Sequence, residues 1–177
     1  MREDQQQRLW QLAGADRLYM ITRSISQGPF PSVADCKDFR QAGITHLFNV
    51  DREYSRRADI DALGFAGIAV YPIEDGRRIP DQQMLDCLAA LNAILVQPDT
   101  HVYIHCRAGV GRSPTVLWLY LVACGLEPGD AKLFIKSRAP YSSPGESTLC
   151  DGDLVQLAVD QRSRYCPPPR AEILQPW

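Results

Sequence analysis

Apolar positions along the chain follow two different periods. Three short and largely apolar runs predict buried β-strands, at 45–50 (THLFNV), 67–73 (GIAVYPI) and 101–106 (HVYIHC). Weaker strand patterns lie at 17–22 and 24–27. After Pro80, which suits the first position of a helix, apolar residues recur at the spacing of one helix face until Pro98. The residues on that face are Met84, Leu88, Leu91 and Leu95.

Further helices are predicted between and after the strands. Ser32 is a suitable N-cap for a helix through Gln41, and Gly43 is a suitable stop. A helix over 113–124 is apolar nearly all round, so we expect it to be buried. The remaining predicted helices cover 55–63, 128–137 and 151–164. This alternation predicts an α/β fold with a central, mainly parallel sheet of about four to five strands, flanked by helices.

Size and charge limit the classes of protein that remain. The chain has 177 residues, of which 45% are hydrophobic, and this suits a single domain over 1–165 followed by a Pro-rich tail over 166–177. Its 19 basic and 21 acidic side chains give a net charge of −2, which gives no indication of a nucleic-acid partner. The sequence has no long apolar stretch, so no membrane span is expected, and residues 1–8 are too polar for a signal peptide.

Six cysteines are scattered along the chain without a CxxC pair. This pattern predicts free thiols in a reducing compartment and therefore a cytoplasmic protein. Ligands clustered at metal-binding spacing are lacking, so we expect neither a metal nor an organic cofactor.

The segment VYIHCRAGVGRSPTVLWLY, residues 102–120, carries the chemistry. Cys106 ends a predicted strand, and parallel sheets bind ligands beyond the carboxyl ends of their strands. Gly109 and Gly111 permit dihedrals that are closed to other residues, so successive N–H groups of the loop can turn inward and face an anion. The loop leads into a helix N-terminus, and Arg112 adds a planar fork for two oxygens. These features predict a tetrahedral oxyanion site, whose binding residues are Arg107, Ala108, Gly109, Val110, Gly111 and Arg112.

A thiol at the base of such a site is a candidate nucleophile. The surrounding positive field favours the thiolate of Cys106, which is then placed to attack a bound phosphate and form a cysteinyl phosphate. Ser113 is positioned to hydrogen-bond the sulfur as it leaves in the second step, and His105 to give polar support. Each of these residues alone has an ordinary structural explanation. Their order between a strand and a buried helix is what indicates catalysis.

The segment HCRAGVGRS resembles the HCxxGxxRS loop of the cysteine-dependent protein tyrosine phosphatases. The resemblance extends over about residues 24–161 and is strongest to compact dual-specificity phosphatases. Residues 71–76 (YPIEDG) resemble the segment that carries their general acid. The stretch IKSRAPYSSP is similar to their late helix and turn, although the family usually has Arg-Pro where this chain has Arg138-Ala139-Pro140.

A general acid is needed to protonate the leaving oxygen. Asp75 is the first candidate because it follows an apolar strand and precedes Gly76, and the resemblance implies the same residue. Glu74 and Asp81 are the alternatives. In the second step the same carboxylate acts as a base toward water. Nearby Arg77 and Arg78 are interpreted either as surface charges or as a patch that steers an anionic substrate. No catalytic role is assigned to His46 and His101, which suit structural positions at strand edges.

The loop composition bears on the substrate. Relatives that act on phosphoinositides tend to carry two extra basic residues in the loop, and here only Arg107 is basic while the other position is Val110. The resemblance therefore favours phosphotyrosine on proteins, with phosphoserine and phosphothreonine as further substrates. Phosphoinositides or inositol phosphates are the alternative. Two other classes remain, a phosphate-binding pseudophosphatase and a sulfurtransferase or arsenate-reducing enzyme.

Overall fold

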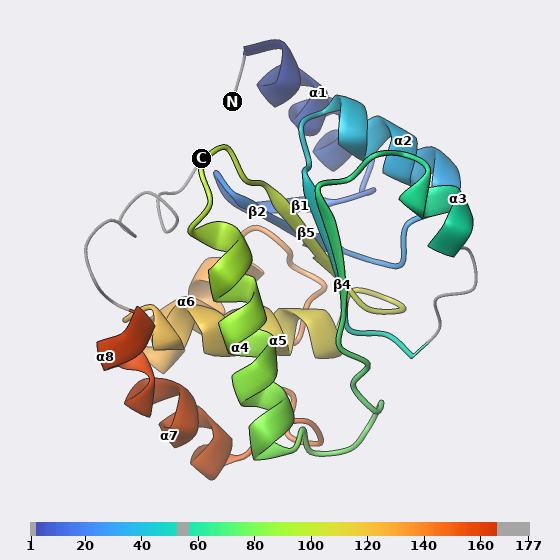
Figure 1. The fold of residues 1–177 in the computed structure, drawn as a ribbon. Helices are drawn as coiled ribbons and strands as arrows, with labels where there is room; N and C mark the ends of the chain where they lie inside the picture. The colour runs from blue at the N-terminus through green and yellow to red at the C-terminus, as the bar shows by residue number, and fades with distance from the viewer. Residues whose placement is uncertain (1–2, 53–56, 166–177) are drawn as a thin grey trace.

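A computed structural model describes residues 3–52 and 57–165. Its strands form one sheet in the order β1-β2-β5-β3-β4, with β1 antiparallel to β2 and the other neighbours parallel (Figure 1). The predicted mainly parallel sheet is confirmed. The strands are β1 (Tyr19–Thr22), β2 (Ile25–Gly28), β3 (His46–Asn49), β4 (Gly67–Val70) and β5 (Val102–His105).

Helices cover both faces of this sheet. On one face lie α1 (Glu3–Gly14), α2 (Val33–Gln41) and α3 (Arg57–Asp61), and on the other lie α4 (Asp81–Leu95), α5 (Arg112–Ala123), α6 (Pro128–Lys136), α7 (Gly152–Asp160) and α8 (Arg162–Tyr165) (Figure 1). Each face has its own apolar core. Every side chain of α5 is buried, as its continuous apolar sequence predicts.

Several boundaries differ from the predictions. The N-terminal helix α1 was not predicted, because it buries only Leu9 and Leu12 and has no long apolar face. Pro80 is the N-cap of α4 rather than its first helical residue. The helix predicted over 151–164 is divided at Gln161 into α7 and α8. The start of the predicted helix 55–63 and the predicted tail 166–177 lie outside the described residues. The Ser32 cap is confirmed, and it forms a capping box with Asp35.

The four parallel strands end level with one another. Gly28 pairs with His105, His105 with Asn49, and Asn49 with Val70. The segments that follow these strands therefore meet along one edge of the sheet. This edge brings together residues that are far apart in the sequence. Among the described helices, none is both long and apolar enough to cross a membrane.

All three histidines of the chain are buried, and burial lowers the pKa of each. The pKa falls to about 4 for His101 and for His105, and it is also lowered for His46. The folded protein therefore binds fewer protons than the unfolded chain when the pH lies between the folded and unfolded pKa values. The stability that the neutral histidines contribute is fully present above pH 6.5, the pKa in the unfolded chain. It is lost as the pH falls toward the pKa values of the folded protein.

We therefore expect the free energy of unfolding to fall by roughly 2 kcal/mol for each of His101 and His105 when the pH is lowered from about 7 to about 5. Urea unfolding at the two pH values measures this difference. A His101→Gln variant that still folds should lose part of the pH dependence. An equal free energy of unfolding at both pH values would show that the buried histidines do not control acid stability.

Candidate active site

Three carbonyl oxygens of the loop between β5 and α5 accept hydrogen bonds from groups outside the loop. The carbonyl of Arg107 accepts from the Phe30 N–H at 3.0 Å, and that of Val110 accepts from the Ser143 N–H at 2.7 Å. The carbonyl of Gly109 accepts from Gln27 Nε2 at 3.3 Å. Within a trans peptide unit the N–H points opposite to the C=O. The N–H groups of the residues that follow these carbonyls therefore point toward the centre of the loop, as an anion site requires. Those residues are Ala108, Val110 and Gly111.

The two loop glycines differ in how strictly the structure requires them. Gly109 has φ of +72°, and a Cβ there would lie 2.5 Å from the backbone carbon of Gly28, so both its conformation and the space exclude other residues. Gly111 has φ of −105°, which other residues adopt readily. Its Cβ would instead collide with a carboxylate oxygen of Glu146. The prediction that Gly111 supplies a dihedral closed to other residues is therefore wrong. Glu146 is exposed and its side chain can move aside, so the space at Gly111 does not exclude other residues either.

Cys106 lies at the base of this loop and is only 2% exposed. The Ser113 hydroxyl lies 3.4 Å from Cys106 Sγ and also 3.4 Å from Gln27 Oε1, so it can donate to either atom. Elsewhere in the chain, burial raises the pKa of the Cys36 and Cys87 thiols to about 12, which leaves them protonated and unreactive. Of these three thiols, only Cys106 has a hydroxyl donor beside it among the described hydrogen bonds.

His105 precedes the cysteine and is fully buried. Its ring makes an edge contact with Phe30, at a centroid distance of 5.2 Å, and stacks on Tyr103 at 5.7 Å. Burial lowers its pKa to about 4, so the imidazole is neutral at physiological pH. The polar support that the sequence suggested for Cys106 stays a prediction.

Arg112 is held by groups from two neighbouring segments, the one after β3 and the one after β4. Its Nη1 donates to Asp51 Oδ1 at 3.0 Å and to the Ile73 carbonyl at 3.2 Å. Its Nε lies 3.4 Å from Asp75 Oδ1. Asp51 was missed in the sequence, although it follows β3 just as Cys106 follows β5. Gln27 was also missed, and its signal was an amide within the short run ISQG, all of which is buried.

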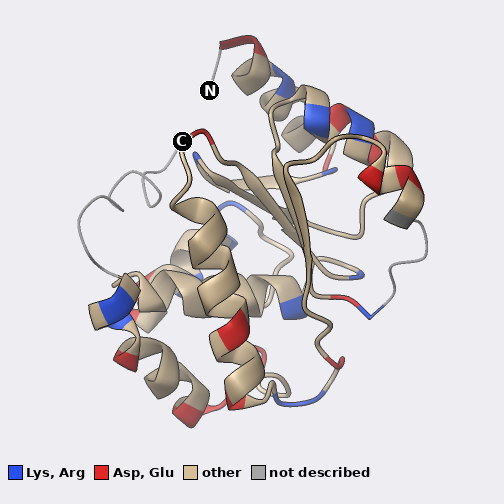
Figure 2. Cartoon of the chain, in the orientation of Figure 1, with Lys and Arg blue, Asp and Glu red and all other residues tan. Residues whose placement is uncertain are grey.

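The structure separates the three acid candidates. Asp75 is the only one of them with a contact to Arg112 among the ion pairs of the described residues. Glu74 pairs with Arg77 at 3.1 Å, and Asp81 pairs with Arg78 at 2.8 Å. Acidic and basic residues thus follow one another along the segment between β4 and α4 (Figure 2).

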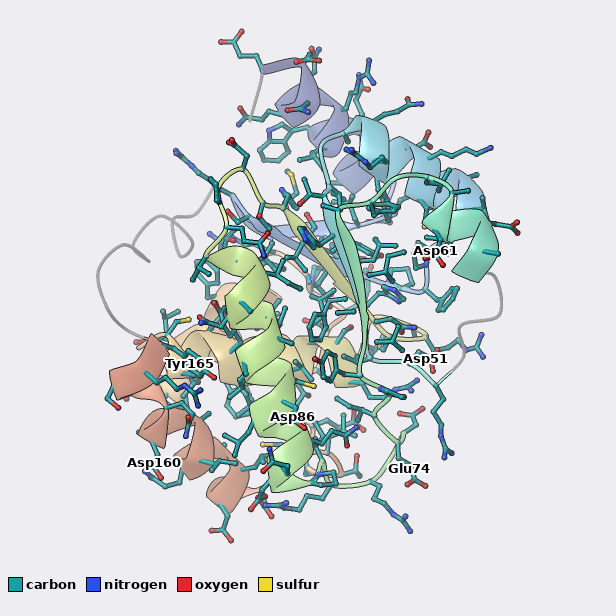
Figure 3. All side chains as sticks on the ribbon, viewed as in Figure 1. Asp51, Asp61, Glu74, Asp86, Asp160 and Tyr165 are labelled. Atoms are coloured by element: carbon teal, nitrogen blue, oxygen red, sulfur yellow. The ribbon has the colours of Figure 1, made fainter. Side chains whose placement is uncertain are left out.

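Asp51 and Glu74 both lie on segments beyond the ends of the strands (Figure 3). The two differ in burial, because the Asp51 side chain is 6% exposed and that of Glu74 is 50% exposed. Within residues 3–52 and 57–165, no cluster of three His, Cys, Asp or Glu side chains could hold a metal ion.

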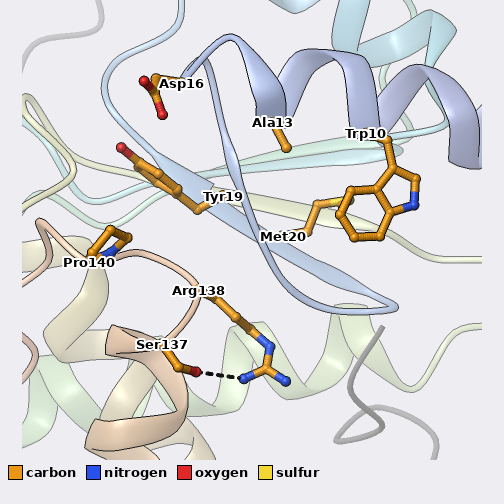
Figure 4. Close-up of a pocket in the computed structure, with 8 residues that line it drawn as sticks. All are labelled: Trp10, Ala13, Asp16, Tyr19, Met20, Ser137, Arg138 and Pro140. Carbon is orange, nitrogen blue, oxygen red and sulfur yellow. Dashed lines mark hydrogen bonds between the residues drawn. The ribbon is translucent and has the colours of Figure 1, made fainter.

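A hollow away from the loop 106–112 lies on another part of the molecule. It has a volume of about 500 Å³ and lies between the C-terminal end of α1, strand β1 and the turn after α6 (Figure 4). Trp10, Tyr19, Met20 and Arg138 contribute to its lining, and no residue of the loop 106–112 does. The candidate active site is therefore assigned from the residues of the loop and of the sheet edge, and not from the volume of a cavity.

Comparison with known proteins identifies the family. A family model described as "Swiss Army Knife protein, DSP-PTPase phosphatase domain" matches residues 25–161. Protein tyrosine phosphatase type IVA 2 of Mus musculus is 30% identical over 103 residues, which are 58% of this chain and 61% of that protein. Type IVA 3 of Bos taurus is 27% identical over 121 residues, 68% of each chain. The chain thus spans about three fifths of the length of the type IVA 2 relative.

Solved structures show the same fold at lower identity. Tk-PTP in its active form superposes with a TM-score of 0.66 at 18% identity, covering 83% of this chain and 97% of that one. PTPMT1 gives a TM-score of 0.66 with the same identity and coverage. Because the family model covers most of the chain, including the loop, Arg112 and Asp75, this protein belongs to the DSP-PTPase phosphatases, a branch of the cysteine-dependent protein tyrosine phosphatase superfamily.

Proposed function

We propose that the protein hydrolyses phosphate monoesters through a cysteinyl-phosphate intermediate on Cys106. The observation that carries the proposal is the convergence of three groups on one loop. Cys106 lies at its base, Arg112 is buried at its end, and Asp75 lies 3.4 Å from Arg112 Nε. Nucleophile, phosphate binder and acid are the three functions that this reaction needs.

In the first step the phosphate oxygens accept hydrogen bonds from the loop N–H groups and from Arg112. The Cys106 thiolate attacks phosphorus, a P–S bond forms and the P–O bond to the leaving group breaks. Asp75 gives its proton to the leaving oxygen. The Asp75 side chain is 79% exposed, so it is free to leave Arg112 Nε when a phosphate oxygen takes its place.

In the second step a water attacks phosphorus and the P–S bond breaks. Asp75, now ionised, takes a proton from this water. The Ser113 hydroxyl, 3.4 Å from Sγ, stabilises the thiolate as it leaves. While the sulfur is bonded to phosphorus, the same hydroxyl can donate to Gln27 Oε1 instead.

We further propose phosphotyrosine on proteins as the main substrate, with phosphoserine and phosphothreonine as further substrates. Arg107 is the one extra basic residue of the loop, and its Nε lies 3.5 Å from Asp51 Oδ2. The Asp51 carboxylate offsets the positive charge of Arg107, and a second phosphate group would need that charge for binding. The other position holds Val110, which is 39% exposed and apolar. The surface around the loop therefore suits a side chain with a single phosphate.

Phosphoinositides are the second candidate, favoured by the presence of Arg107. The structure of PTPMT1 in complex with PI(5)P has a similar fold, with a TM-score of 0.65 at 13% identity. That likeness supports a shared fold. It does not transfer the ligand of PTPMT1 to this protein.

Turnover should depend on Cys106. With p-nitrophenyl phosphate and EDTA present, Cys106→Ser should lower kcat by at least about 10³-fold, because the serine hydroxyl is a much poorer nucleophile than a thiolate. Binding of inorganic phosphate should persist, since the loop N–H groups and Arg112 remain. Residual activity near that of the wild type would exclude Cys106 as the nucleophile.

The role of Asp75 is tested by pH. An acid catalyst must carry its proton, so the wild-type kcat should fall as the pH rises above the pKa of that acid. Asp75→Ala should lower kcat by about 10²-fold and remove this alkaline limb. Glu74→Ala is the matched control and should keep it. If the limb survives in Asp75→Ala, the acid is another residue.

Substrate choice is tested by comparing kcat/KM for a phosphotyrosine peptide and for PI(5)P in vesicles. We expect the peptide to be preferred, and Arg107→Ala to change this preference little because Asp51 already offsets that charge. A higher kcat/KM for PI(5)P, lost in Arg107→Ala, would favour the second candidate.

A further inference from the structure

Asp51 is a carboxylate buried beside a site built to hold an anion. Its side chain is 6% exposed, and a buried charge is strongly unfavourable unless it is paired. Its two oxygens have separate partners. Oδ1 accepts from Arg112 Nη1 at 3.0 Å and from the Arg52 N–H at 2.8 Å, and Oδ2 lies 3.5 Å from Arg107 Nε. One carboxylate thus joins the first and the last arginine of the loop.

These contacts determine which edge of Arg112 is left for a ligand. A guanidinium binds phosphate best through two adjacent N–H groups on one edge. Asp51 and the Ile73 carbonyl both occupy Nη1. The edge formed by Nε and Nη2 remains, and the exposed carboxylate of Asp75 lies at Nε. The fixed carboxylate is therefore on the side of the guanidinium opposite to the exchangeable one.

We propose that Asp51 is a positioning residue for the reaction, which turns the Nε–Nη2 edge of Arg112 toward the transferring phosphoryl group and keeps Arg107 at the rim of the loop. The proposal rests on the phosphatase function proposed above. Asp51 acts through the two arginines and does not touch the substrate. Its own charge repels a bound phosphate in the ground state and in the transition state alike, so this repulsion affects mainly KM. The orientation of Arg112 matters most in the transition state, where charge spreads over the equatorial oxygens.

The two effects predict a division between kcat and KM. Asp51→Asn keeps the shape and an acceptor for Arg52 but removes the charge that holds the arginines. We expect its kcat to fall by about tenfold or more, while KM changes by less than about threefold. Affinity for orthovanadate, which forms a five-coordinate complex resembling the transition state, should fall with kcat. Asp51→Glu keeps the charge and should retain more activity than Asp51→Asn.

A double-mutant cycle with Arg112→Lys separates positioning from a general structural effect. Lysine has no fork to orient, so Asp51→Asn should change kcat by less than about twofold in that background. Asp35→Asn is the matched control, because it removes a carboxylate that pairs with Arg17 Nε at 2.6 Å and that contacts neither Arg107 nor Arg112 among the described interactions. It should lower the free energy of unfolding and leave kcat unchanged. If Asp51→Asn does not fold, Asp51→Ser takes its place in the cycle.

An Asp51→Asn kcat close to that of the wild type would overturn the proposal, and so would an equal loss in the Arg112→Lys background. If the wild type hydrolyses none of the phosphate esters, the proposed function fails. Orthovanadate binding then tests separately whether Asp51 positions Arg112. Weaker orthovanadate binding in Asp51→Asn, absent in the Arg112→Lys background, would support positioning. Unchanged orthovanadate binding would refute it.

Discussion

The site depends on a backbone loop in which three carbonyl oxygens, those of Arg107, Gly109 and Val110, are held by groups outside it. A pocket made from N–H groups exists only while the peptide units keep this direction, and the Phe30 and Ser143 amides and the Gln27 side chain maintain it. Gly109 is the tightest point, because its Cα lies against the backbone of Gly28 at the end of β2. The loop is thus held by the neighbouring strand as well as by its own sequence, which is the preorganisation that the proposed oxyanion site requires.

The charged groups at the site are two arginines and two carboxylates, and the two carboxylates differ in burial. Asp51 is 6% exposed and fixed between Arg107 and Arg112, whereas Asp75 is 79% exposed and contacts Arg112 from the solvent side. A buried pair orients a group, and an exposed acid can move between Arg112 and a leaving oxygen. In the proposed reaction the same residue type thus has two roles, and burial is what distinguishes them.

The sequence predicted the parts of the fold that have continuous apolar runs or a strong local signal. The parallel sheet and buried α5 are confirmed for this reason, and the loop motif led to the family. The helix α1 was not predicted because two buried leucines among polar residues give little periodicity. Asp51 and Gln27 were missed because their importance depends on strand order, which places β3 and β2 on either side of β5. A pattern along the chain does not contain that order.

The central claim is that the phosphoryl group passes through the sulfur of Cys106. Acid quenching during turnover, followed by mass spectrometry of the peptides, tests it most directly. The Asp75→Ala variant with an aryl phosphate is the best material, because the loss of the base slows the second step more than the first when the leaving group is good. The account predicts a phosphoryl group on the peptide that contains Cys106. Turnover with no phosphorylated peptide, or with the phosphoryl group on another residue, would contradict it.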